Sequence, residues 1–232
     1  MSHSEKNNSI VLASTSPRRR ELIARFHYPV SLCAPIAKEG PPKLNEAPTD
    51  YVERMAVLKA ESARHNMSTS DLIIGADTIV WSNNEIFGKP SSGHDASMML
   101  RFLRNSTHNV STSMVLIAPD REDILIQTST VSVTMRDYSD AEIEEYVKTG
   151  DPMDKAGAYA IQHKGFHPVK TFEGCYTSVL GLPLCTLSIS LRRYGVKICP
   201  VECGVGIDSQ YYVASSKLKI DNTVDELSLI HI

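Results

Sequence analysis

The run from Asp71 to Trp81, DLIIGADTIVW, is the feature that most limits how this chain can fold. Such a mostly apolar run is typical of a strand that is buried in a sheet, and Gly75 is expected to break it. Asp77 lies in the middle of the run, where an ionised carboxylate costs free energy unless it has a partner. The sequence therefore predicts a core strand that carries one acid with a special role.

Other apolar runs alternate with amphipathic segments along the chain. SIVLA predicts a second buried strand, and two longer runs separated by Pro119–Asp123 predict a hairpin. The expected strands besides Asp71–Trp81 are Ser9–Ala13, Val110–Ala118, Ile124–Met135 and Val169–Phe172, and the expected helices are Arg18–Phe26, Thr49–His65, His94–Leu103, Ser139–Lys148 and Pro183–Tyr194. Strands and helices in this order, with one antiparallel pair, predict an α/β domain with a mixed sheet. We expect residues 1–198 to form this domain and residues 199–232 to be an appended tail.

Bulk composition narrows the class of partner. The formal net charge is -3 and the pI about 6.2, whereas binders of nucleic-acid polymers usually carry a basic excess. A small anionic substrate needs only a few local cations. No apolar run approaches the roughly 20 residues of a membrane span, and the polar first residues show no leader, so we expect a cytoplasmic protein without a membrane partner. The 5 cysteines are scattered and odd in number, which predicts free thiols.

A group of cations at the start of the first helix suggests an anion site. Ser16 is a candidate cap and Pro17 suits the first turn, after which Arg18, Arg19 and Arg20 follow directly. Cations at this end oppose the helix dipole, at a cost of a few tenths of a kcal/mol each. A bound anion would reverse the sign of that effect.

A lysine inside an apolar stripe is the second such signal. Lys59 lies three and four residues after Ala56 and Met55, on the apolar side of the helix Thr49–His65. A lysine in that position must extend to solvent, pair with an acid, or face a cleft.

The segment LASTSPRRREL (Leu12–Leu22) resembles the N-terminal signature of the Maf family of nucleotide pyrophosphatases. Five further segments continue the resemblance in the family's order, over about residues 10–197: YVERMAVLKA (Tyr51–Ala60), GADTIV (Gly75–Val80), GKP (Gly88–Pro90), DKAGAYAIQ (Asp154–Gln162) and VLGLPL (Val179–Leu184). One such segment is weak evidence, whereas six in register are specific.

The resemblance implies a fold and a reaction. The fold is an elongated twisted sheet flanked by helices in two lobes with a central cleft, similar to inosine triphosphatase. The reaction is a metal-dependent cut between the α- and β-phosphates of a nucleoside triphosphate, which yields a monophosphate and pyrophosphate. GADT together with AYAIQ resembles the branch that acts on dTTP and UTP. Because many relatives are dimeric, the resemblance also implies a homodimer.

Carboxylates are the expected centre of the chemistry. Asp77 is the candidate general base that activates a water for attack on the α-phosphorus, and its alternative is a core acid paired with a lysine. Glu39, in the loop Ile36–Pro48, matches the position where the family has an acid near the metal. Glu39 and Asp77 together are the candidate ligands of Mg²⁺, Mn²⁺ or Co²⁺. A loop glutamate is otherwise usually solvated.

Cations and hydroxyls are the candidate phosphate contacts. Lys59 and Lys89 are expected to stabilise the charge that develops on the leaving pyrophosphate. Arg18 and Arg19 would hold the polyphosphate at the helix start, and Ser14 would add a hydroxyl. The alternative for each cation is an ordinary exposed or extended side chain. Arg20 is expected to point elsewhere.

Base recognition is assigned to Gln162. Its amide can both accept and donate, which matches the N3–H and O4 edge of uracil or thymine and mismatches cytosine. Thr78 is another position where the family tunes substrate choice. Two departures from the family pattern stand out: His163 replaces a usual glycine beside the expected base pocket, and Arg104-Asn105 replace Ser-Gly in a turn.

Two other functions remain open from the sequence. One keeps the chemistry and changes the base to 7-methyl-GTP or another purine nucleotide. The other is a non-catalytic nucleotide-binding regulator of cell division, which would tolerate loss of Asp77. Asp154 belongs to neither argument directly; it is expected to orient a neighbour.

Overall fold

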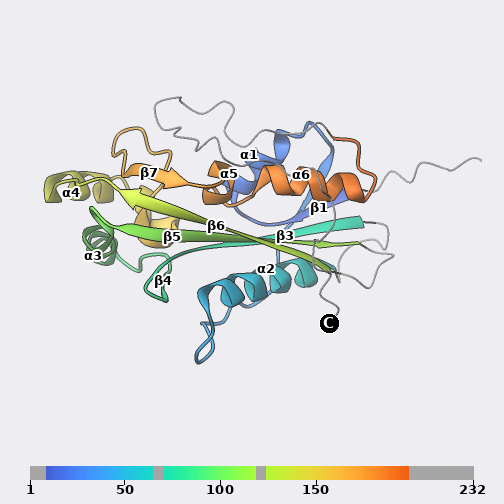
Figure 1. The fold of residues 1–232 in the computed structure, drawn as a ribbon, viewed down its shortest axis with the longest axis horizontal. Coiled ribbons are helices and arrows are strands. Elements are labelled where there is room, and N and C mark those ends of the chain that lie inside the picture. The colour runs from blue at the N-terminus through green and yellow to red at the C-terminus, as the bar shows by residue number, and fades with distance from the viewer. Residues whose placement is uncertain (1–8, 65–70, 119–123, 199–232) are drawn as a thin grey trace, which may run out of the picture.

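The computed structural model describes residues 9–64, 71–118 and 124–198, and it has a mixed sheet with helices on both faces (Figure 1). The sheet is seven-stranded in the order β2-β1-β3-β5-β6-β7, with β4 paired to β3. Its strands are β1 Ser9–Ala13, β2 Val30–Cys33, β3 Asp71–Ser82, β4 Glu85–Phe87, β5 Thr107–Ile117, β6 Ile124–Met135 and β7 Val169–Glu173. The helices are α1 Pro17–Ala24, α2 Pro48–Arg64, α3 Gly93–Leu103, α4 Asp140–Lys148, α5 Tyr176–Val179 and α6 Leu184–Arg193, with short 3₁₀ turns η1 Asp151–Asp154 and η2 Ala156–Ala158. The predicted α/β class is confirmed, and the expected tail 199–232 lies outside the described residues.

Three local predictions are wrong. Strand β3 is continuous through Gly75 instead of breaking there. Ser16 occupies the position before α1 but its side chain makes no capping bond; instead, the Ser16 backbone N–H donates to Ser14 Oγ at 3.1 Å. Among the described cysteines, Cys33 is a free thiol as expected, whereas Cys185 is disulfide-bonded.

The pairing of β3 changes along its length, and this change leaves residues 76–79 unpaired with any described strand on one edge of β3. We call this unpaired stretch the opening in the sheet. β1 runs parallel to β3 and its last pair is Ala13 with Gly75. β4 pairs antiparallel with β3 and its first pair begins at Val80. On that edge, none of the described strands pairs with residues 76–79, while β5 pairs continuously along the other edge. The chain that leaves β1 enters α1 at this opening, and the carboxyl end of a parallel strand is where ligands commonly bind.

Helix α2 covers one face of the sheet, while α1, α5 and α6 lie on the opposite face (Figure 1). The approach of α2 to β3 is close because Gly75 has no side chain: a Cβ there would lie 2.6 Å from the Ala56 carbonyl oxygen and 2.7 Å from the Ala60 Cβ. A small apolar cluster that includes Ala56, Ala60 and Ile73 fills this layer. Lys59 is therefore held close to β3.

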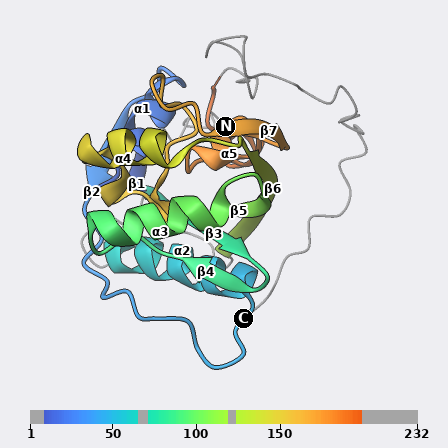
Figure 2. The same cartoon turned by 90° about the vertical axis from the view of Figure 1, so that its left-hand side faces the viewer.

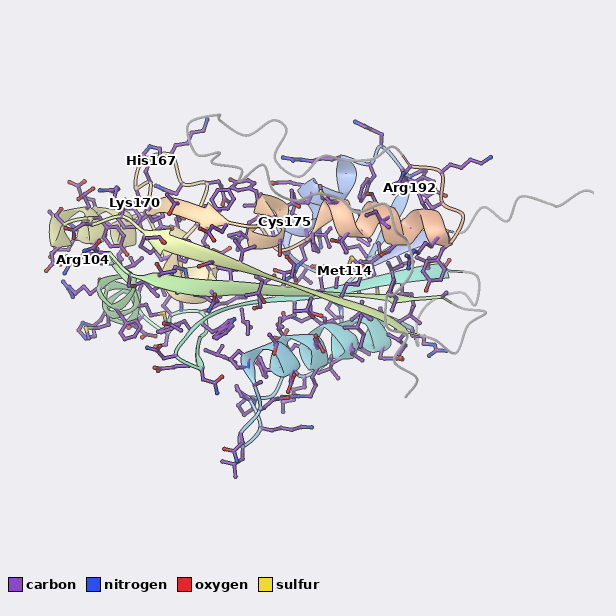
Figure 3. The ribbon with its side chains drawn as sticks, in the orientation of Figure 1. Arg104, Met114, His167, Lys170, Cys175 and Arg192 are labelled. Carbon is purple, nitrogen blue, oxygen red and sulfur yellow. The ribbon has the colours of Figure 1, made fainter. Side chains whose placement is uncertain are left out.

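The other face carries the larger core. Fully buried Met114 of β5 packs there together with the apolar residues of α6 (Figure 3). Helices α3 and α4 lie at the end of the sheet (Figure 2). There Asn105 has a φ of 51°, and Arg104 Nη1 donates to the Tyr138 carbonyl at 3.1 Å and pairs with Asp140 at 2.9 Å. Arg104 thus links the end of α3 to the start of α4, and Asn105 makes the turn after α3.

None of the helices in the described part of the chain combines the length and apolar character that crossing a membrane would require.

Candidate active site

Asp77 and Lys59 form a buried ion pair beside the opening in the sheet. Alternation along β3 places Asp77 on the same face as Gly75, toward α2. Lys59 Nζ donates to Asp77 Oδ1, and the two side chains are only 11% and 12% exposed, lysine first. Both signals noted in the sequence therefore have one explanation: the lysine in the apolar stripe is the counter-charge of the acid in the apolar strand.

Glu39 joins this pair from the loop between β2 and α2. Its Oε1 lies 3.0 Å from Lys59 Nζ, and its side chain is 52% exposed. Two carboxylates thus share one ammonium, so the group carries net negative charge. A loop, a helix and a strand supply its three members, Glu39, Lys59 and Asp77.

The carboxylate pair fits part of a magnesium-type site. Mg²⁺ typically takes one or two carboxylates and completes its shell with water and substrate phosphate oxygens. Within the described residues, no group of three His, Cys, Asp or Glu side chains could hold a metal ion. Metal binding by Asp77 and Glu39 stays a prediction; if these two carboxylates hold a cation, the remaining positions would fall to phosphate and water.

Arg19 is buried and reaches across to β3 from α1. Its Nε donates to the Gly181 carbonyl at 2.8 Å, and its Nη2 donates to Thr78 Oγ1 at 3.0 Å. The pKa of Arg19 is lowered, mainly by burial, although the negative charge of Asp77 acts in the opposite direction. Arg19 therefore lies within electrostatic reach of Asp77 while it fixes the loop after α5.

Thr78 continues this network to the neighbouring strand. Its hydroxyl lies 2.9 Å from Thr112 Oγ1, and the Thr112 hydroxyl donates to the Ser178 carbonyl at 2.7 Å. Thr112 and Ser178 escaped the sequence reasoning. The segment VLGLPL pointed to Gly181, but no local pattern joins it to Arg19 or Thr112.

The start of α1 is partly accessible. Ser14 is buried and its Oγ accepts from the backbone, as described above. Arg18 is half-buried, whereas Arg20 is exposed, as expected. The pKa of Asp154 is lowered: burial acts to raise it, but the hydrogen bond from Lys155 and the charges of Lys155 and Arg18 outweigh that effect. Asp154 is thus a negative neighbour of Arg18.

A second ion cluster anchors the segment that follows α4. Lys155 is buried, and its Nζ donates to the Asp151 carbonyl at 2.5 Å, to Asp151 Oδ1 at 2.9 Å and to Asp154 Oδ1 at 2.6 Å. The Tyr146 hydroxyl donates to Asp151 Oδ2 at 2.7 Å and accepts from the Ala160 N–H at 3.1 Å. Lys155 and Tyr146 were not singled out in the sequence, although DKAGAYAIQ contains the lysine.

Two candidate residues lie exposed, outside these networks. Lys89 follows β4, where the Gly88 carbonyl accepts from the Gly157 N–H at 3.1 Å. Gln162 lies in the turn after η2. Among the described residues, no hydrogen bond or ion pair joins either side chain to Asp77, so their roles stay predictions. His163 shapes that turn, because its Nδ1 accepts from the Phe166 N–H at 2.9 Å.

The model of the family described as Maf-like protein matches residues 9–194. The chain belongs to this family.

The match to curated relatives extends over nearly the whole length of those proteins. A relative from Dictyoglomus thermophilum is 38% identical over 82% of this chain and 97% of its own, and one from Geobacter sp. strain M21 is 43% identical over the same shares. Both are named dTTP/UTP pyrophosphatase. A solved nucleoside-triphosphatase / dITP/XTP pyrophosphatase from Mycobacterium abscessus is similar over 56% of this chain and 75% of that one, with 17% identity and a TM-score of 0.37. A likeness of that size adds nothing to the assignment.

Proposed function

We propose that this chain hydrolyses dTTP and UTP to the nucleoside monophosphate and pyrophosphate. The names of the curated relatives support the substrates. The observation that carries the proposal is the carboxylate pair, Asp77 and Glu39, held by Lys59 at the opening beside β3. A buried acid that is paired with a lysine and lies next to the arginine-rich start of a helix suits attack on a polyphosphate.

Asp77 acts as the general base. Its carboxylate accepts the proton of the water that attacks the α-phosphorus, and the bond to the bridging oxygen of pyrophosphate breaks. Lys59 supplies positive charge at the reacting end, and Arg18 supplies it at the start of α1. Asp77 and Glu39 would hold a divalent cation, Mg²⁺, Mn²⁺ or Co²⁺, which neutralises phosphate charge and polarises the water.

Gln162 selects the base in this proposal. Its exposed position leaves the amide available for the Watson–Crick edge of uracil or thymine. The turn that carries it is fixed by His163 and, through Ala160, by Tyr146.

The test is a panel of dTTP, UTP, CTP and 7-methyl-GTP, each with Mg²⁺, Mn²⁺ and Co²⁺, in which monophosphate and pyrophosphate are both quantified. Asp77→Asn should lower kcat/KM by about 10²–10⁴-fold, the range typical of a lost general base. Asp137→Asn, at an exposed position away from the site, is the matched control. Equal rates for wild type and Asp77→Asn would exclude Asp77 as the base.

The same panel separates the other functions. A preference for 7-methyl-GTP would replace the pyrimidine assignment, and nucleotide binding without any product would favour a non-catalytic regulator. Gln162→Ala should erase the preference of UTP over CTP; if that preference persists unchanged, the base is read elsewhere.

A further inference from the structure

The loop that carries Glu39 has little apolar attachment of its own. Leu44, near its end, is 93% exposed, and Ile36, at its start, is 73% exposed. Hydrophobic burial therefore does not fix the position of this loop. Yet Glu39 lies within 3.0 Å of Lys59 Nζ, so another interaction must restrain the loop.

A two-pronged ion pair ties the loop to α2. Arg54 Nε donates to Glu46 Oε1 at 2.6 Å, and Arg54 Nη2 donates to Glu46 Oε2 at 2.7 Å. The Glu46 side chain is only 9% exposed, and its Oε2 also accepts the Lys43 N–H at 2.8 Å. Arg54 Nη2 further donates to the Pro41 carbonyl at 3.3 Å. Bidentate pairs of this kind fix orientation as well as distance.

Tyr51 attaches the loop next to Glu39 itself. Its hydroxyl donates to the Gly40 carbonyl at 3.2 Å, one residue after Glu39. Arg54 lies over the Tyr51 ring, 5.3 Å from its centroid. The pKa of Tyr51 is raised, first by burial and then by the charges of Asp77 and Glu39, so this phenol lies beside the carboxylate pair. We call Glu46, Arg54 and Tyr51 the loop clasp.

Two of the clasp residues, Tyr51 and Arg54, lie on the same helix as Lys59, namely α2. Tyr51 and Lys59 are eight residues apart on α2, which is about 2.2 turns, so they lie on the same side of the helix. Helix α2 thereby fixes Lys59 against Asp77 and also holds the loop that brings Glu39 to the same ammonium. The pKa of Glu46 is lowered to about 2, chiefly by its hydrogen bond from Arg54, so the pair stays charged at neutral pH.

We propose that the loop clasp positions Glu39 beside Asp77 and thereby sets the affinity of the site for a divalent cation. Glu46, Arg54 and Tyr51 are positioning residues: they act through Glu39 and touch neither metal nor substrate. This inference rests on the proposed function in one respect only, namely that Asp77 and Glu39 hold the cation. Loss of the clasp should weaken cation binding while the step at phosphorus, at saturating cation, stays nearly unchanged.

The experiment compares full-length wild type with Arg54→Ala, Glu46→Gln and Arg54→Lys, which keeps the charge but loses the fork. Arg64→Ala is the matched control, because Arg64 pairs with Glu61 on the same helix, three residues apart. Mn²⁺ alone is titrated into each protein, with the water-proton relaxation rate as the readout. Arg54→Ala should raise the Kd for Mn²⁺ about tenfold, equivalent to about 1.4 kcal/mol; Arg64→Ala should leave it unchanged.

Trypsin provides a readout that is independent of metal and activity. Lys38 and Lys43 lie in the loop, so release of the clasp should accelerate cleavage after them in Arg54→Ala and Glu46→Gln, but not in Arg64→Ala or Asp77→Asn. If wild type binds no Mn²⁺ and yields no pyrophosphate while this pattern of cleavage is seen, the proposed function fails and the clasp as a restraint on the loop survives. Unchanged cleavage in both clasp variants would overturn the clasp itself.

A double variant decides whether the clasp acts through Glu39. In the Glu39→Gln background, Arg54→Ala should add little to the loss of Mn²⁺ affinity, because the group that it positions is already gone. Glu39→Gln alone should weaken Mn²⁺ binding without faster cleavage. If Arg54→Ala costs the same tenfold in both backgrounds, Arg54 affects the site by another route and the inference is wrong.

Discussion

Gly75→Ala is the substitution by which the packing of α2 on β3 can be tested most directly. A Cβ at residue 75 would lie 2.6 Å from the Ala56 carbonyl oxygen, 2.7 Å from the Ala60 Cβ and 2.9 Å from the Ala60 backbone nitrogen. Ordinary contacts begin near 3.4 Å. The helix must therefore retreat by about 0.8 Å, since two of the three atoms are backbone and cannot rotate away.

That displacement should lower both the stability of the fold and the rate of the reaction. Overpacking of a rigid core costs about 1–3 kcal/mol, and backbone contacts place this case near 3 kcal/mol. Lys59 lies one turn after Ala56, so it moves away from Asp77 with the helix. A misplacement of roughly 1 Å near a reacting centre can cost about 10²-fold in rate. We therefore expect kcat/KM for UTP to fall by roughly 10–100-fold in protein that is still folded.

Urea unfolding followed by circular dichroism gives the first quantity, and pyrophosphate release well below the unfolding transition gives the second. Gly88→Ala is the stability control, because a Cβ there would meet no atom within 4 Å. If Gly75→Ala unfolds within about 0.5 kcal/mol of wild type and keeps full activity, the close contact between α2 and β3 does not exist as described.

Two pH predictions follow from other groups. Burial lowers the pKa of His108 to about 4, and its Nε2 lies 2.7 Å from the Tyr159 hydroxyl. Between pH 6.5 and 4 the unfolded chain binds a proton at His108 that the folded chain does not. About 3 kcal/mol of stability should therefore be lost as the pH falls over that interval. In urea titrations, the free energy of unfolding should change less with pH in His108→Gln than in wild type. The pKa of Glu142 is lowered to about 2, first by the Ser139 N–H and then by Arg136. The stability that the ionised Glu142 contributes is present above pH 4.5 and is lost as the pH falls through 2. The loss of unfolding free energy caused by Glu142→Gln, measured by the same urea titrations, should therefore shrink between pH 4.5 and 2.

Local sequence patterns predicted the elements but not all of their ends. The hairpin of β5 and β6 and the α/β order follow from apolar periodicity, and the start of the helix predicted over Ser139–Lys148 is fixed by a capping box between Ser139 and Glu142. The break predicted at Gly75 is wrong, because a glycine inside a strand can instead allow the close approach of a helix. β2 was missed because its side chains are mostly exposed, which leaves little apolar signal.

The candidate site was predicted where the residues themselves were unusual. Lys59 in an apolar stripe and Asp77 in an apolar strand each demanded a partner, and the fold pairs them. Arg19 was expected at the polyphosphate, but two of its guanidinium nitrogens donate to Thr78 and to a carbonyl 162 residues away. Sequence spacing holds no information on such a contact, because it depends on how the layers stack around the sheet.

The geometry of β3 explains why the site draws on both faces of the sheet. Asp77 and Thr78 are adjacent, so alternation sends one toward α2 and the other toward α1 and the loop after α5. Thr78 is held by Arg19 and Thr112, while β5 pairs with the backbone of both residues. Between the end of β1 and the start of β4, where no described strand pairs with this edge of β3, these side-chain contacts help to hold the strand in place. The placement of the Asp77 carboxylate therefore depends on side-chain bonds made on the opposite face, and any substitution that loosens Thr78 must also loosen the acid.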